Sequence, residues 1–201
     1  MDWAAAITHL TSADPRLTPL VARHGPPTIK PRDRGQVIAS LARAIVGQQL
    51  SGKAADTIWG RVLAIWGGRF PAPAKIVATD DSVLRAAGLS GAKSAALKDL
   101  ARHVVDKKLV PARLLAAADD EVAAMLLPVR GIGPWSVDMF LMFSLARPDV
   151  LPVGDLGIRK GMQRHFKLRK LPEPDRMRAL AAPWRPYRTI ASWYMWRLLE
   201  S

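Results

Sequence analysis

The stretch Leu127-Pro128-Val129-Arg130-Gly131-Ile132-Gly133-Pro134-Trp135 decides the fold of this chain. Gly131 and Gly133 can take the positive φ angles that a tight turn needs. Pro134 suits a first helical position, because that position has no amide partner to lose. The pattern therefore predicts a hairpin between two helices. We expect the segment from residue 125 to residue 166, which contains this hairpin, to organise the rest of the chain.

A glycine turn that leads into a helix directs backbone N–H groups and the positive end of the helix dipole outward, which suits a phosphate. The turn alone is equally consistent with a plain helix connection. The charge favours the phosphate, since 30 Lys+Arg against 17 Asp+Glu give a formal net charge of +13. A chain this basic often binds a polyanion, and a phosphate backbone would supply salt-sensitive attraction. The alternative is that the excess charge is only solvated surface.

Apolar residues recur at three- and four-residue intervals on both sides of the hairpin, and no alternating apolar run of the β type persists. The sequence therefore predicts an all-α protein. The helix after the hairpin is almost wholly apolar, so we expect it in a core. Helices are predicted to begin at Asp2, Asp33, Ser51, Asp80, Ser90 and Asp119.

The composition excludes several kinds of site. The absence of cysteine excludes disulfides, thiolate zinc sites and cysteine-ligated iron–sulfur clusters, and we expect neither a transition metal nor a cofactor. No apolar run is long enough to span a bilayer, and Met1-Asp2-Trp3 lacks the features of a signal peptide. These features predict a cytoplasmic protein without a membrane partner.

Two further places carry candidate side chains. Gln48, Gln49 and Leu50 form a break between two predicted helices, and the amides can either satisfy a structural corner or probe a groove. Asp155 is predicted to begin the helix that follows the loop at residues 146–152, and an aspartate at a helix start is commonly only an N-cap. Asp138 and Asp149 are the rival carboxylates, and we expect Asp138 to anchor a buried polar network.

Four motifs in this order and spacing resemble the helix-hairpin-helix DNA glycosylase superfamily, and within it the alkyl-base glycosylases of the 3-methyladenine II type. The resemblance covers the chain from about Asp33 to the C-terminus. It rests on the segments at residues 43–51, 131–135, 155–160 and 183–185, the last together with Trp193-Tyr194. Each motif alone is weak, but together they are specific.

The resemblance implies a single glycosylase domain over residues 1–201, built as two helical lobes with a cleft between the corner at 43–51 and the hairpin with Asp155. Asp155 takes the place of the catalytic aspartate. A monovalent cation is expected on the hairpin carbonyls, and the expected partner of this monomer is double-stranded DNA that contains alkylated bases. The remaining implied sites are the phosphate-binding hairpin (Val129, Arg130, Gly131, Ile132, Gly133), the base pocket (Trp135, Met139, Trp193) and the DNA wedge (Gln48, Gln49, Leu50).

The chemistry is consistent with these roles. Cleavage of an N-glycosidic bond passes through a cationic sugar, which a fixed carboxylate stabilises. Indole faces attract a cationic alkylated base by about 0.5 to 2 kcal/mol each. Strand-nicking relatives carry a lysine where Trp135 stands, so we expect no Schiff base and an abasic product. Met139 replaces an aromatic of some relatives, which leaves substrate breadth open.

Two other functions are compatible with parts of the sequence. A non-catalytic helix-hairpin-helix module would explain the charge and the glycines, but it leaves Asp155 without a purpose. An excision enzyme for oxidised or mismatched bases is disfavoured by Trp135 in place of lysine.

Overall fold

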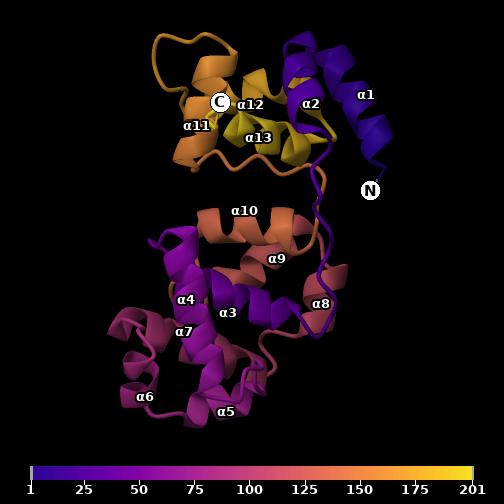
Figure 1. Cartoon of the computed structure of the whole chain (residues 1–201). Helices are drawn as coiled ribbons and strands as arrows, with labels where there is room; N and C mark the ends of the chain where they lie inside the picture. Colours follow the sequence, from indigo (N-terminus) through magenta and orange to yellow (C-terminus); the bar gives the residue numbers. More distant parts are fainter. Residues whose placement is uncertain (1, 201) are drawn as a thin grey trace. The chain divides into compact units, whose positions relative to one another are not determined.

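The computed structural model describes residues 2–200, and this part of the chain is helical without a β-strand (Figure 1). The all-α prediction is therefore confirmed over the described residues. The chain divides into two compact units, as expected for two helical lobes: residues 1–31 with 141–201 form the first, and residues 32–140 form the second. None of the described helices is long and apolar enough to cross a membrane.

The first unit joins the two ends of the chain. It contains α1 (Trp3–Ala13), a 3-10 turn (Pro15–Leu17), α2 (Thr18–His24), α11 (Leu156–His165), α12 (Pro174–Leu180), a second 3-10 turn (Ala182–Trp184) and α13 (Arg188–Arg197). The second unit contains α3 (Val37–Gly47), α4 (Gly52–Ala64), α5 (Pro73–Ala78), α6 (Asp81–Ala86), α7 (Gly91–Val105), α8 (Pro111–Ala116) and α9 (Asp119–Leu126). The boundary between the units falls inside α10 (Pro134–Phe143).

Most of the predicted helix starts are confirmed by their caps. The side chains of Asp2, Ser51 and Ser90 each accept a hydrogen bond from the backbone N–H three residues later. Asp80 caps α6 by accepting from the N–H of Ser82. These are local interactions, so the sequence alone identifies them.

One helix start, at Asp33, and one cap, at Asp119, were predicted wrongly. The helix expected from Asp33 begins at Val37, because the Asp33 carboxylate accepts from the N–H of Gln36 and holds a turn ahead of α3. Asp119 is the first residue of α9 and not its cap. Glu121 supplies the capping bond there, since its carboxylate accepts from the N–H of Ala118.

The core of the second unit is built around α3 and α7. One side of α3 is wholly buried, and α7 packs against both α3 and α5. The buried apolar residues of these two helices are Val37, Ile38, Leu41, Ala42, Ile45, Val46, Ala96, Leu97, Leu100 and Ala101. Because α7 packs in this core, its backbone is held in place, and so are the starting points of its side chains outside the core.

The first unit has a separate core in which α11 packs on α13. Gly161 makes the close approach possible, because a Cβ at this position would collide with the backbone carbonyl of Met195. The core also buries a polar cluster around Asp14, whose carboxylate accepts from His165 Nε2 at 2.7 Å and from Trp184 Nε1 at 3.1 Å. Arg16 binds the other carboxylate oxygen at 2.7 Å.

This cluster predicts how stability depends on pH. Burial lowers the pKa of His165 below its usual value of 6.5, although its bond to Asp14 acts in the opposite direction. Burial would raise the pKa of Asp14, but hydrogen bonds from Arg16, His165 and Trp184 outweigh it and lower that pKa. At both groups the unfolded chain binds protons more readily than the folded one. The contribution of these two groups to the free energy of unfolding is therefore fully present above about pH 6.5. It is lost as the pH drops through the folded pKa of His165 and then that of Asp14.

Urea unfolding at pH 7.5 and pH 5.5 tests this prediction. The free energy of unfolding should be lower at pH 5.5, and the decline should be smaller in a His165→Gln variant, which keeps an N–H donor for Asp14 but does not titrate. Equal declines in the two proteins would show that His165 is not responsible.

Candidate DNA-binding and catalytic sites

The predicted hairpin is present between α9 and α10. Val129 and Ile132 are buried and anchor it, and the N–H of Ile132 donates to the carbonyl of Val129 at 3.0 Å. Gly131 has a φ of +79°, as expected for the turn. The same expectation for Gly133 is wrong, because only Gly131 of the pair has a positive φ. Gly133 precedes Pro134, and the residue before a proline is confined to extended conformations.

Side chains on one face of α7 contact the hairpin and hold it in place. The Asp99 carboxylate accepts from the backbone N–H of Arg130 at 2.8 Å. A Cβ on Gly131 would lie 3.1 Å from the Cβ of Ala96, so a side chain there would press on α7 in addition to straining the backbone. Position 131 is therefore restricted to glycine for two independent reasons.

The same face of α7 holds the glutamine corner. Lys93 Nζ donates to the carbonyl of Val46 at 2.8 Å and to the carbonyl of Gln48 at 2.7 Å, which satisfies two groups at the end of α3. Lys93, Ala96 and Asp99 are spaced three residues apart, so they lie along one side of the helix. Burial lowers the pKa of Lys93. One helix therefore sets the positions of both the corner and the hairpin.

Within the corner, the three predicted wedge residues differ. The side-chain amide of Gln48 donates to the carbonyl of Gly131 at 2.8 Å, which ties the corner directly to the hairpin. Gln49 is exposed and has a φ of +59°, a conformation that costs a residue other than glycine about 1 to 3 kcal/mol. Leu50 is 37% exposed. The structure thus presents Gln49 and Leu50 at the surface and engages Gln48 internally.

Replacing Lys93 by Met should loosen this arrangement. Methionine keeps the apolar stem but leaves the carbonyls of Val46 and Gln48 without their donor, at a cost of about 1 to 3 kcal/mol in the free energy of unfolding. A urea titration measures the loss. Lys98→Met is the matched control, since Lys98 lies on the same helix but pairs with the exposed carboxylate of Asp81. Equal losses in the two variants would contradict a special role for Lys93.

Asp155 lies at the N-terminus of α11 in the first unit. Its Oδ1 accepts from the N–H of Ile158 at 2.8 Å, so the residue is the N-cap of the helix. The same oxygen accepts from Trp196 Nε1 at 3.0 Å. The side chain is partly exposed, and Leu156 beside it is 53% exposed. A carboxylate held in this way at a helix start can stabilise a positive charge that develops next to it.

The rival carboxylate Asp149 has a structural role. Its two oxygens accept from Arg188 Nε at 2.6 Å and from Arg188 Nη2 at 2.9 Å, which is a bidentate ion pair within the first unit. Asp138 lies partly buried on α10. Asp155 therefore stays the candidate for catalysis.

The predicted base-pocket residues are distributed over the two units. Trp135, which is 43% exposed, and the half-buried Met139 lie on α10 in the second unit. Trp193 lies half-buried on α13 in the first, with the guanidinium carbon of Arg197 4.8 Å from its ring centroid. That these three residues form one pocket stays a prediction.

The predicted cation site also stays a prediction. Among the hairpin carbonyls, that of Val129 accepts from the N–H of Ile132 and that of Gly131 accepts from Gln48. A carbonyl oxygen has a second lone pair, so both are compatible with a further ligand. Over residues 2–200 there is no group of three or more His, Cys, Asp or Glu side chains that could hold a metal ion.

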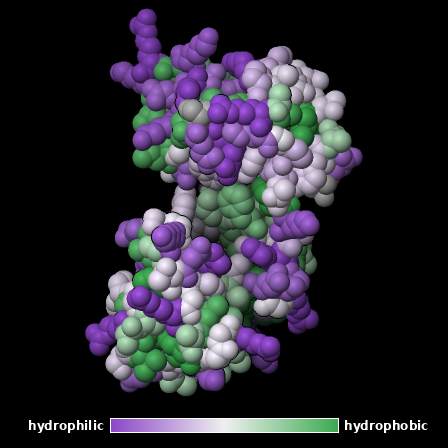
Figure 2. Space-filling model, viewed as in Figure 1, coloured by the Kyte–Doolittle hydropathy of each residue, from purple (hydrophilic) through white to green (hydrophobic). Residues whose placement is uncertain are grey.

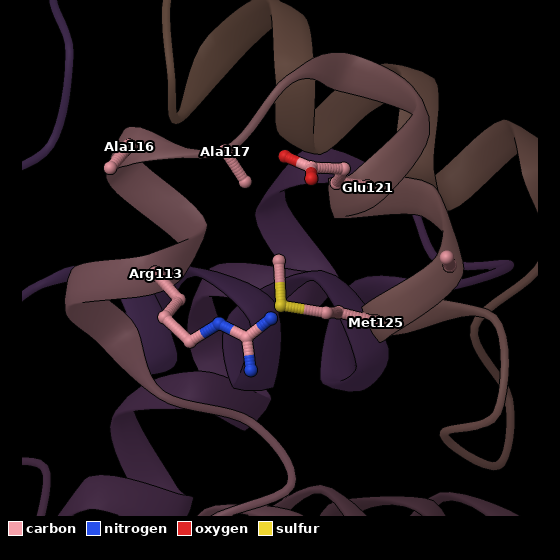
Figure 3. Close-up of a pocket in the computed structure, with 6 residues that line it drawn as sticks. Arg113, Ala116, Ala117, Glu121 and Met125 are labelled. Atoms are coloured by element: carbon pink, nitrogen blue, oxygen red, sulfur yellow. The ribbon is translucent and has the colours of Figure 1, made fainter.

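A depression of about 500 Å³ lies between α8 and α9 (Figure 3). Arg113, Glu121 and Met125 line it together with three alanines. None of the predicted site residues lines it. Figure 2 shows hydrophilic side chains spread over both units on the face viewed.

Three residues that hydrogen-bond to the candidate site segments were missed at the sequence level, namely Lys93, Asp99 and Trp196. Lys93 and Asp99 stand six residues apart on a helix that also carries Lys98, Arg102 and His103, so their spacing is only a weak signal. For Trp196 the signal was Gly157, because a glycine two residues after Asp155 indicates that another side chain approaches closely.

Comparison with known proteins agrees with this geometry. Residues 42–186 match the model of the HhH-GPD superfamily base excision DNA repair protein family. The chain is 35% identical to DNA-3-methyladenine glycosylase 1 of Schizosaccharomyces pombe over 195 residues, which cover 94% of this chain and 84% of that protein.

Two solved structures are similar over nearly the whole chain. The S. pombe 3-methyladenine DNA glycosylase Mag1 in complex with abasic DNA has a TM-score of 0.84 and 33% identity, and the match covers 96% of this chain and 95% of that one. A DNA-3-methyladenine glycosidase from Bacillus halodurans has a TM-score of 0.81 and 33% identity, with 96% and 88% covered. The chain therefore belongs to the HhH-GPD superfamily of base excision DNA repair proteins, as its motifs predicted.

Proposed function

We propose that this protein is a monofunctional DNA glycosylase that flips alkylated bases of the 3-methyladenine type out of duplex DNA, hydrolyses their N-glycosidic bonds and leaves abasic sites. The observation that carries the proposal is Asp155, a carboxylate fixed by two donors at the start of α11 in a chain of this family. The names of the relatives, which are 3-methyladenine glycosylases, support the substrate class.

In this mechanism Asp155 stabilises the sugar as it gains positive charge, and it orients the attacking water. The water adds to the anomeric carbon while the C–N bond breaks, so the base leaves with the bonding electrons and the added water releases one proton to solvent. An N-alkylated purine is already cationic and becomes neutral on leaving, which makes a general acid on the base dispensable. Catalysis of bond cleavage therefore depends mainly on stabilisation of the cationic sugar, which the fixed carboxylate provides.

Extrusion of the base costs a few kcal/mol and needs a group to fill the gap and a grip on the backbone. Gln49 and Leu50, which are both exposed, suit the filling role. Gln48 positions the corner through its bond to Gly131. The hairpin and the start of α10 suit the grip on phosphate.

Trp135 is the better candidate for attraction of a cationic base. One face of Trp193 already receives the guanidinium of Arg197, and Trp193 is half-buried, whereas Trp135 is 43% exposed. Because Trp135 also stands where strand-nicking relatives carry lysine, no amine is present there to attack the sugar. Base release without strand cleavage is the expected outcome.

Incubation of the pure protein with methylated duplex DNA tests the proposal directly. Released bases are identified by mass, and strand breaks are assayed before and after alkali. We expect free 3-methyladenine, with breaks only after alkali. Duplex binding without base release would favour a non-catalytic helix-hairpin-helix module. Release of oxidised bases alone would favour an excision enzyme for oxidised or mismatched bases. We also propose that the protein is a monomer, and light scattering with and without DNA tests this.

A further inference from the structure

We propose that Trp196 is a positioning residue for the reaction, and that its indole N–H holds the Asp155 carboxylate in its working orientation. The inference rests on the proposed role of Asp155. It concerns a contact within the first unit, between α11 and α13.

The carboxylate is fixed from two directions. The N–H of Ile158, on the helix that Asp155 caps, lies 2.8 Å from Oδ1. Trp196 Nε1, which is 41 residues away in the chain, lies 3.0 Å from the same oxygen. A cap bond alone leaves the carboxylate free to rock about it, whereas a second donor from another helix fixes its plane. A carboxylate that is already oriented stabilises a short-lived cationic sugar more strongly than one that must first reorient.

The indole is itself held in place. Its ring stacks on Phe143 with centroids 5.7 Å apart and planes inclined by 29°. Gly157 leaves the space that the indole occupies: a Cβ on Gly157 would lie 2.8 Å from both Cδ1 and Nε1 of Trp196, and 3.0 Å from Oδ1 of Asp155. The stack and the missing side chain together direct the N–H at the carboxylate.

A hydrogen bond to a charged group is stronger than one between neutral groups, so the loss of this donor should be measurable. Trp196→Phe keeps an aromatic ring on Phe143 and removes only the N–H and the second ring. We expect the single-turnover rate of 3-methyladenine release, measured at saturating protein, to fall about 10- to 100-fold. Affinity for a duplex with an abasic-site analogue and the thermal midpoint should change little.

Trp66→Phe is the matched control. Trp66 is also partly buried, and its Nε1 donates to Thr79 Oγ1 at 3.2 Å in the second unit. This variant loses an indole N–H bond away from Asp155, so its rate of base release should stay within about twofold of the original protein.

Gly157→Ala provides a second variant in case Trp196→Phe does not fold. Alanine favours a helix more than glycine does, but its Cβ must displace the indole. We expect a comparable loss of rate although Trp196 is intact. If the original protein releases methylated bases and both variants do so within threefold of its rate, the role of Trp196 is refuted while the proposed function stands. If the original protein releases none, the proposed function fails first.

Discussion

Asp155→Asn should lower the rate of 3-methyladenine release from methylated duplex DNA by about 100- to 1,000-fold while duplex binding is retained. The variant removes the negative charge that would stabilise the cationic sugar. Asparagine is as good an N-cap as aspartate, and its amide oxygen can accept the bonds from Ile158 and Trp196 that Oδ1 accepts. The substitution therefore separates catalysis from capping. Single-turnover kinetics and a titration with labelled duplex measure the two effects.

Two further substitutions define what this result means. Asp155→Ala removes both charge and cap, so it should match the Asn variant in rate but also lose about 0.5 to 2 kcal/mol of stability. Asp149→Asn is the matched carboxylate control in the same unit, because Asp149 is paired with Arg188. It should affect stability more than base release. Unchanged release by the Asn variant would remove Asp155 from the mechanism.

The sequence was sufficient for the parts of the fold that depend on near neighbours. The caps at Asp2, Ser51, Asp80 and Ser90 involve residues two or three positions apart, and the hairpin turn involves a run of nine. Asp33 and Asp119 show the limit of this approach. At each helix start several residues compete for the same N–H groups, and the winner depends on side-chain geometry that composition does not specify.

The contacts that position the site are not local, which is why the sequence did not predict them. Lys93 reaches a carbonyl 45 residues away, Asp99 reaches an N–H 31 residues away, and Trp196 reaches a carboxylate 41 residues away. Each requires that two helices already pack in a certain register. The motifs supplied the residues that would touch DNA, whereas the residues that hold them follow only from the tertiary structure.

The two hairpin glycines should respond differently to substitution. Gly131→Val places a β-branched residue at a φ of +79° with its Cβ 3.1 Å from Ala96, so we expect a loss of about 1 to 3 kcal/mol in the free energy of unfolding. A Cβ on Gly133 meets no atom within 4 Å and needs no positive φ. Gly133→Val should therefore keep nearly the full stability, and urea unfolding of both variants measures the difference.

DNA binding is where the glycine at position 133 should matter. If a phosphate approaches the backbone at the start of α10, the added valine side chain lies in its way, and affinity should fall about tenfold or more for damaged and undamaged duplexes alike. Gly91→Val is the control, since Gly91 also stands in open space at a helix start. A loss confined to duplexes with an alkylated base would contradict a grip on phosphate, because a phosphate contact carries no information about the base. A uniform loss with intact stability would mean that the open space beside Gly133 is kept for the DNA backbone.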